Sequence, residues 1–172
     1  MLIPQASNTA GSVDSVFYRI LWIEIGLLVL VTFALIFFVI KYNSSKKTVP
    51  VNIPGSVPLE IIWTVIPTLI VLFMFYIGLM SFDSIRSVPA TVMDIRVTGR
   101  QWSWLFTYEN GRQSSDLRVP LEEPVKLLLT SDDVLHSFYI PAFRIKEDCV
   151  PKMQTYLSFI ADETGTFDIF CT

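Results

Sequence analysis

The sequence predicts a two-helix transmembrane hairpin followed by one all-β domain, and three observations lead to this prediction. Two apolar stretches of membrane-spanning length occupy the first half of the chain. A short loop that carries lysines and no acids separates them. From Ala90 onward the continuous apolar pattern gives way to short alternating runs. The hydrophobic content is 52%, and most of it lies in the first half of the chain, as expected for a membrane anchor joined to a small folded domain.

The two predicted helices cover residues 16–41 and 59–82. Each is close to the roughly 20 residues that a helix needs to cross the apolar core of a bilayer. The first is too long for the apolar part of a signal peptide, and no small-residue cleavage site follows it. We therefore expect both helices to be retained, with residues 1–15 as a polar tail in front of them.

The connecting loop, residues 42–58, sets the expected sidedness. It contains Lys46 and Lys47 and no acidic residue, and its prolines and Gly55 do not favour a helix. By the positive-inside rule this loop lies in the cytoplasm or the mitochondrial matrix. The N-terminal tail and residues 83–172 then both lie on the outer side.

Two acids and a proline interrupt the apolar helices. Glu24 is one turn inside the first helix and can be an interfacial acid beside Arg19. Glu60 begins the second helix, where the helix dipole favours an acid, although acids at such positions also mark ion paths. Pro67 breaks the backbone ladder within a membrane helix, which predicts packing against a larger membrane subunit.

Residues 83–172 are predicted to be all-β, as a sandwich or small Greek-key barrel. Turn signals such as Asn110-Gly111 separate the runs, and Trp102 and Trp104 are expected on the same side of one strand. This part is acidic, which argues against nucleic acid and favours a cationic partner, although an ordinary solvated surface has a similar charge. The predicted strands are residues 91–99, 101–111, 116–120, 124–131, 134–141, 152–161 and 166–171.

The candidate metal ligands are His136, the single histidine, and Cys171. Alone, a histidine beside apolar residues is commonly structural, and a free cysteine is commonly a small buried apolar residue. Together, at strand ends of an outward-facing β domain, they are the ligand types of a cupredoxin-type copper site, which needs a second histidine and an axial group. The pair is thus half of such a set. Cys149 can be an inert buried thiol or a disulfide partner of Cys171.

Four motifs carry a resemblance to a known family. They are "PLEIIWTVIP" at 58–67, "GRQWSWLF" at 99–106, "SDDVLHSFYIPAFRIKEDCVP" at 131–151 and "GTFDIFCT" at 165–172. In order and spacing they resemble subunit II of haem–copper cytochrome c oxidases, over residues 16–172. The resemblance implies a cupredoxin-like Greek-key barrel that carries a dinuclear copper A centre.

By this resemblance His136 and Cys171 are copper ligands, the cysteine as a bridging thiolate. Trp102 matches the tryptophan through which an electron enters from cytochrome c. Three acids match positions that dock the lysine-rich rim of cytochrome c, and they are Asp132, Asp133 and Asp148. Glu60 matches the mouth of a proton-uptake path into subunit I.

The family's last motif resembles Cys-x-Glu-x-Cys-Gly-x-x-His-x-x-Met, and this sequence ends one residue after its first cysteine, at Thr172. We expect the chain to be a fragment whose remaining copper ligands, last strand and ligand loop lie beyond Thr172. If Thr172 is the true end, two coppers cannot be held, and a membrane-tethered domain with an empty barrel remains. The sequence also departs from the family at Lys152, where a turn glycine is usual, and at Cys149, where a small alanine is common.

The function that the resemblance implies is electron entry into a proton-pumping terminal oxidase. Cytochrome c would reduce the copper centre, and haems and a further copper on subunit I would reduce oxygen to water, with subunit III as another partner. The expected location is a bacterial inner membrane, with the β domain periplasmic, or alternatively the mitochondrial inner membrane. The alternatives are a copper-free structural subunit II of a quinol oxidase and, less compatible with a two-helix anchor, a nitrous oxide reductase domain.

Overall fold

The computed structural model describes residues 3–43, 54–89 and 91–172. The chain divides into two compact units. The first comprises Val16–Leu79, and the second comprises Met1–Ser15 together with Met80–Thr172. The prediction for the lysines of the connecting loop, Lys46 and Lys47, lies outside the described residues.

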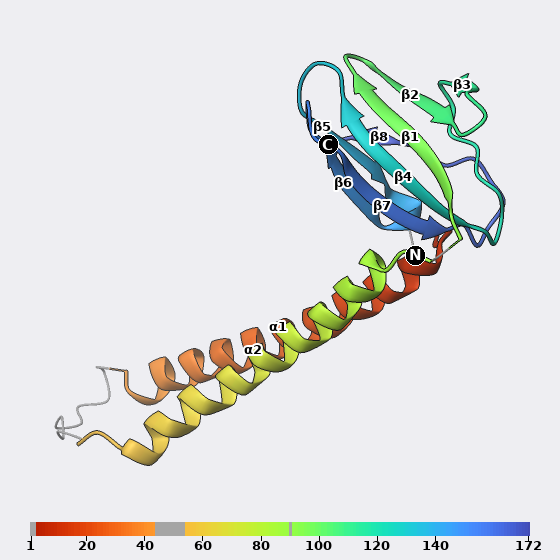
Figure 1. Ribbon diagram of the computed structural model, residues 1–172. Coiled ribbons are helices and arrows are strands. Elements are labelled where there is room, and N and C mark those ends of the chain that lie inside the picture. Colours follow the sequence, from red (N-terminus) through yellow and green to blue (C-terminus); the bar gives the residue numbers. More distant parts are fainter. Residues whose placement is uncertain (1–2, 44–53, 90) are drawn as a thin grey trace. The chain divides into compact units, whose positions relative to one another are not determined.

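The first unit consists of most of two helices, α1 (Asn8–Lys41) and α2 (Val57–Arg86). Residues 8–15 of α1 and 80–86 of α2 belong to the second unit. Both are long and apolar enough to cross a membrane, and most of their large apolar side chains are exposed. Such side chains are stable when lipid or another apolar partner covers them. The predicted pair of apolar helices is therefore present (Figure 1).

The helix ends differ from the prediction. Residues 8–15, expected as a polar tail, already form the first turns of α1. The side-chain oxygen of Asn8 accepts the Ile160 N–H at 2.9 Å, and the Thr9 hydroxyl donates to the Phe143 carbonyl at 2.9 Å. These bonds to the β domain satisfy polar groups at the helix start, so the helix begins before the apolar stretch does.

The β domain contains two sheets, which the strand labels in Figure 1 locate. The five-stranded sheet has the order β3-β2-β1-β4-β7, with β1 antiparallel to β2 and parallel to β4. The three-stranded sheet has the order β6-β5-β8. The strands are β1 (Met93–Arg100), β2 (Ser103–Tyr108), β3 (Gln113–Ser114), β4 (Pro124–Ser131), β5 (His136–Ile140), β6 (Ile145–Cys149), β7 (Thr155–Ile160) and β8 (Phe170–Cys171), with a 3-10 turn at Pro141–Phe143.

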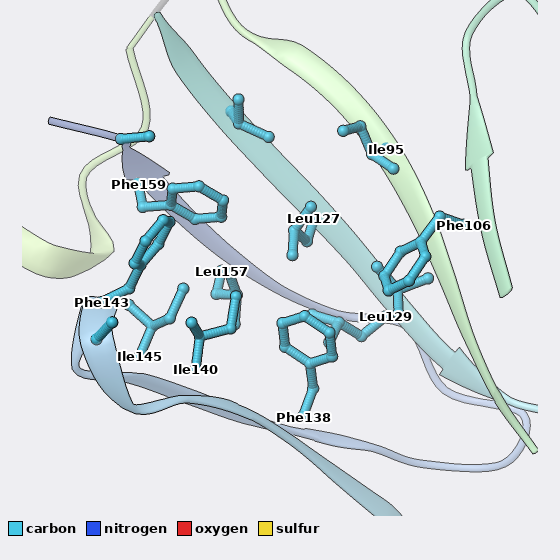
Figure 2. Packing of buried hydrophobic residues seen from close by; sticks show 14 of the residues in the cluster. Ile95, Phe106, Leu127, Leu129, Phe138, Ile140, Phe143, Ile145, Leu157 and Phe159 are labelled. Carbon is cyan, nitrogen blue, oxygen red and sulfur yellow. The ribbon is translucent and has the colours of Figure 1, made fainter. Parts of the chain in front are cut away.

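The two sheets share one apolar core, shown in Figure 2. Phe138 of β5 is fully buried, and its ring meets those of Trp104 and Phe106 of β2 edge to face, at centroid distances of 5.2 and 6.3 Å. Leu127 and Leu129 of β4 lie in the same core. The prediction of two apolar helices followed by an all-β domain is confirmed, and the β domain is built as two facing sheets.

Parts of the β domain differ from the predicted strands. Residues 116–120 form no strand, because the backbone N–H of Arg118 donates to the Tyr108 hydroxyl at 2.7 Å and a side chain thus takes the place of a ladder partner. β6, in which only Ile145 and Cys149 are buried, was not predicted, because charged residues fill its other positions. The segment expected as a strand at 166–171 pairs only at its last two residues, β8.

The backbone at Lys152 shows why a glycine is usual at this turn. Its φ is +62°, in the left-handed region that glycine adopts at little cost. A glycine at this turn is thus physically favoured, and this chain tolerates a lysine there.

Candidate metal centre

The candidate ligands meet because β8 pairs with β5. His136 is the first residue of β5, and Cys171 of β8 lies opposite Phe138 in the antiparallel register. Opposite residues, and residues two apart on a strand, point to the same face of a sheet. The Nδ1 atom of His136 and the Sγ atom of Cys171 are 3.8 Å apart. The structure thus brings together the two residues that the sequence singled out.

The His136 ring is enclosed on several sides, and its side chain is 11% exposed. The Trp104 ring packs against it at a centroid distance of 5.9 Å. Gly99 of β1 faces it closely, because a Cβ atom added there would lie 3.0 Å from the His136 Cδ2 atom. A side chain at residue 99 would therefore displace the imidazole, so the glycine leaves the room that the His136 ring needs.

Asp133 determines which ring nitrogen of His136 faces the cysteine. Its Oδ1 atom lies 2.7 Å from the Nε2 atom of His136. An ionised carboxylate only accepts hydrogen bonds, so Nε2 carries the hydrogen. In the neutral imidazole Nδ1 then keeps its lone pair on the side of Cys171, as a metal ligand requires.

The three groups shift each other's pKa values. Hydrogen bonds from the Gln101 N–H, His136 and the Val134 N–H hold the pKa of Asp133 well below its usual range. The bond to Asp133 raises the pKa of His136 above 6.5. The Ser137 N–H lowers the pKa of the Cys171 thiol, and His136 lowers it further when its ring is protonated. The site therefore favours an ionised Asp133 and a more readily ionised Cys171.

Cys149 behaves differently from Cys171. It lies opposite His136 in the β5–β6 register, is fully buried, and its pKa is raised to about 12, chiefly by burial. Both cysteines are free thiols. They lie on opposite neighbours of β5, so roughly 10 Å separates their backbones, beyond the roughly 7 Å that a disulfide can bridge. The structure thus supports the inert thiol and not the disulfide.

The donor set fits a part of a copper site. An imidazole nitrogen and a cysteine sulfur are ligands that copper accepts well. Within residues 3–43, 54–89 and 91–172 there is no group of three or more His, Cys, Asp or Glu side chains that could hold a metal. The described residues therefore supply two donors, His136 and Cys171, without completing a site.

The two tryptophans occupy different environments, contrary to the prediction that they share one side of a strand. Trp104 is half-buried against the core, whereas Trp102 lies in the turn between β1 and β2 and is 95% exposed. The residue before it, Gln101, donates its N–H to the Oδ2 atom of Asp133 at 2.7 Å. The carboxylate that holds His136 thus also holds the turn that displays Trp102.

The other predicted site residues are less closely associated. Asp132 pairs with Arg100 at 2.9 Å. Asp148 is exposed on β6 opposite Ser137, and so on the other face of the sheet from His136. Glu60 is exposed in the first turn of α2, in the other unit. The roles predicted for these acids stay predictions.

Sequence reasoning missed the contributions of Gly99, Ser131 and the Gln101 backbone. The Ser131 hydroxyl donates to the Val134 carbonyl and accepts the Asp133 N–H at 3.2 Å, and so helps to shape the turn that carries the carboxylate. A serine and an acid shortly before a histidine, as at Ser131, Asp133 and His136, could have indicated such a turn in the sequence. The approach of Gly99 to His136 spans two strands and has no local pattern in the sequence.

Comparison with known families decides the relationship. The model "Cytochrome C oxidase subunit II, transmembrane domain" matches residues 1–83, and "Cytochrome C oxidase subunit II, periplasmic domain" matches residues 112–172. The chain belongs to the cytochrome c oxidase subunit II family. As a member with two long apolar helices and the family's transmembrane domain, it is membrane-anchored.

Individual relatives agree with the family. Cytochrome c oxidase subunit 2 of Synechocystis sp. is 28% identical over 96% of this chain and 65% of its own length. That of Thermostichus vulcanus is 29% identical over 99% and 69%, and that of Alkalihalophilus pseudofirmus is 35% identical over 87% and 47%. The chain therefore spans between about half and two-thirds of the length of these relatives.

Among solved structures, the periplasmic domain of subunit II of cytochrome oxidase of Bradyrhizobium japonicum is 29% identical. The match covers 50% of this chain and 75% of that one, with a TM-score of 0.47.

The two thiols are expected to react at very different rates. Iodoacetamide at neutral pH should label Cys171, which is exposed and has a lowered pKa, and should spare Cys149 until the chain unfolds. Peptide mass spectrometry of the reduced, copper-free chain measures this, with a Cys171→Ser variant as control. Equal labelling of both thiols in the folded chain would contradict the described burial of Cys149.

The pair of Asp133 and His136 is expected to make stability depend on pH. The raised pKa of His136 gives stability that is complete below 6.5 and is lost as pH rises through the folded value. The lowered pKa of Asp133 gives stability that is present above 3.8 and is lost as pH falls through the folded value. Asp133→Asn should therefore lower the urea midpoint of the copper-free chain more at about pH 5.5 than at about pH 9.

The matched control for this measurement is Asp132→Asn, which removes a neighbouring carboxylate that does not bond to His136. It should show the same loss at both pH values. An Asp133→Asn effect that does not change with pH would mean that the two groups are not coupled.

Proposed function

We propose that this chain is the electron-entry subunit of a haem–copper terminal oxidase. It accepts electrons from cytochrome c at a dinuclear copper centre and passes them to haem in subunit I, where oxygen is reduced to water. The observation that carries the proposal is the pair of His136 Nδ1 and Cys171 Sγ, 3.8 Å apart, in a member of the subunit II family.

In this proposal His136 and Cys171 hold copper and supply two of the ligands of the dinuclear centre. Copper bound there takes up and releases single electrons. The chain's own residues prepare the site, because Asp133 keeps the hydrogen on Nε2 and the Ser137 N–H favours the thiolate of Cys171.

The donor approaches at Trp102 in this proposal. Its indole is almost fully exposed, and a planar exposed ring offers contact area with little loss of side-chain entropy. Asp132, Asp133 and Asp148 supply negative charge for the lysine-rich rim of cytochrome c. Such complementarity mainly raises the association rate, and salt weakens it.

The membrane part has its own proposed roles. The exposed apolar faces of α1 and α2 would meet lipid and oxidase subunits I and III, and Glu60 would stand at the mouth of a proton-uptake path. The proposed location is a bacterial inner membrane with the β domain on the periplasmic side, or alternatively the mitochondrial inner membrane.

One observation favours a second candidate, a copper-free structural subunit II of the quinol-oxidase type. The described residues contain no group of three potential metal ligands. Against this candidate stand His136, Cys171 and Trp102 themselves, since a copper-free subunit has no need of an imidazole with its free nitrogen beside a thiol.

Copper content tests the proposal. The subunit purified in its oxidase complex should contain copper, and both His136→Ala and Cys171→Ser should lose most of it, since each removes one of the few donors that a copper site has. Elemental analysis and electron paramagnetic resonance measure this. Cys149→Ser is the matched control, a thiol change next to the site that should leave copper in place. A wild-type complex without copper in this subunit would support the structural alternative.

Trp102 is expected to govern electron entry. Trp102→Ala should slow reduction of the complex by cytochrome c at least about tenfold, the loss expected when a hot-spot indole is truncated, with little change in copper content. Stopped-flow spectroscopy measures this, with Tyr156→Phe, a change at another exposed aromatic residue, as control. An unchanged rate would remove Trp102 from the proposal.

A further inference from the structure

Asp133 is bonded on both of its carboxylate oxygens. The Oδ1 atom accepts from His136 Nε2 and from the Val134 N–H, each at 2.7 Å. The Oδ2 atom accepts from the Gln101 N–H, also at 2.7 Å. The Ser131 hydroxyl oxygen accepts the backbone N–H of Asp133 at 3.2 Å. The Asp133 side chain is 32% exposed, so it is partly a surface acid, but both of its oxygens bond to groups within the chain.

These bonds join two parts of the chain that are distant in sequence. Gln101 and Asp133 are 32 positions apart, and His136 follows on the next strand. The path starts at Trp102 and follows the backbone through Gln101 to the Gln101 N–H. From there it passes through the carboxylate of Asp133 to the Nε2 atom of His136. An unbroken series of covalent and hydrogen bonds therefore connects the exposed indole with the imidazole.

We propose that Asp133 is a positioning residue that fixes the Trp102 turn and the metal-facing nitrogen of His136 to each other. The part of this proposal that concerns copper rests on the proposed function. The hydrogen bonds of Asp133, however, are a property of the copper-free chain. With Nε2 held by Asp133 and the ring packed between Gly99 and Trp104, the imidazole can neither flip nor swing away, so Nδ1 stays beside Cys171.

The neighbouring acid provides the contrast. Asp132 has its own partner, with its Oδ2 atom 2.9 Å from the Nε atom of Arg100, and its side chain is more exposed, at 52%. Although both acids belong to one turn, only Asp133 bonds to His136 and Gln101. A general effect of negative charge would involve both acids, whereas a positioning effect belongs to Asp133 alone.

The test is hydrogen exchange in the full-length, copper-free chain in detergent micelles, with both thiols reduced. Because the chain has a single histidine, selective nitrogen-15 labelling gives one imidazole, and the exchange of its Nε2 hydrogen can be followed together with that of the Gln101 amide. Asp133→Ala should accelerate exchange at both positions by at least about tenfold, the loss expected for hydrogen bonds to a charged group. Asp132→Ala should change neither by more than about twofold.

A second variant separates positioning from folding. Asp133→Asn keeps the size of the side chain but has one acceptor oxygen in place of two, so it should protect either the His136 hydrogen or the Gln101 amide, not both. Unchanged exchange in Asp133→Ala, equal acceleration in Asp132→Ala, or full protection in Asp133→Asn would each overturn the inference.

Copper affinity keeps this inference distinct from the proposed function. If Asp133 positions His136 for the metal, Asp133→Ala should weaken copper binding about 10–100-fold, the usual effect of removing the partner of a ligating histidine. Competition with a chelator measures this in the assembled complex. Wild-type chain that binds no copper yet shows the expected exchange pattern would overturn the proposed function alone. Unchanged copper affinity in Asp133→Ala would overturn the positioning role alone.

Discussion

The pairing of β8 with β5 is the constraint on which the candidate metal centre depends. β8 has only two residues, Phe170 and Cys171, and lies at the edge of the three-stranded sheet. Its register sets Cys171 opposite Phe138, and the alternation of a strand then places the thiol on the face that carries His136. A shift by one residue would turn the sulfur to the other face of the sheet, and the two donors would no longer meet.

Strand β5, which carries His136, is held by the core beneath it. Phe138 is fully buried between the two sheets, with Trp104 and Phe106 against its ring. The same Trp104 touches His136, so the packing that holds the sheets together also defines one wall of the site. Stability and ligand geometry are therefore linked, because a change in the core would move the imidazole as well.

The polar side of the site is arranged around the Asp133 carboxylate. Burial alone would disfavour a charged imidazole, and the carboxylate offsets that effect. It also connects to the turn where Trp102 is displayed. The His136 imidazole is enclosed and the Trp102 ring is exposed, and a short turn attached through one carboxylate allows both. Cys149 lies close to this arrangement but is excluded from its chemistry by burial, which keeps its thiol protonated.

The sequence by itself determined the two apolar helices, most of the strands and the residue types of the site. These depend on local patterns, such as the length of the apolar stretches and the alternation in residues 91–99. Only the tertiary structure decided that His136 and Cys171, 35 positions apart, face each other, that Trp102 and Trp104 have different environments, and that Asp133 bonds to both His136 and Gln101. The physical reason is that strand register and side-chain packing are set by contacts between distant segments, which no local pattern in the sequence records.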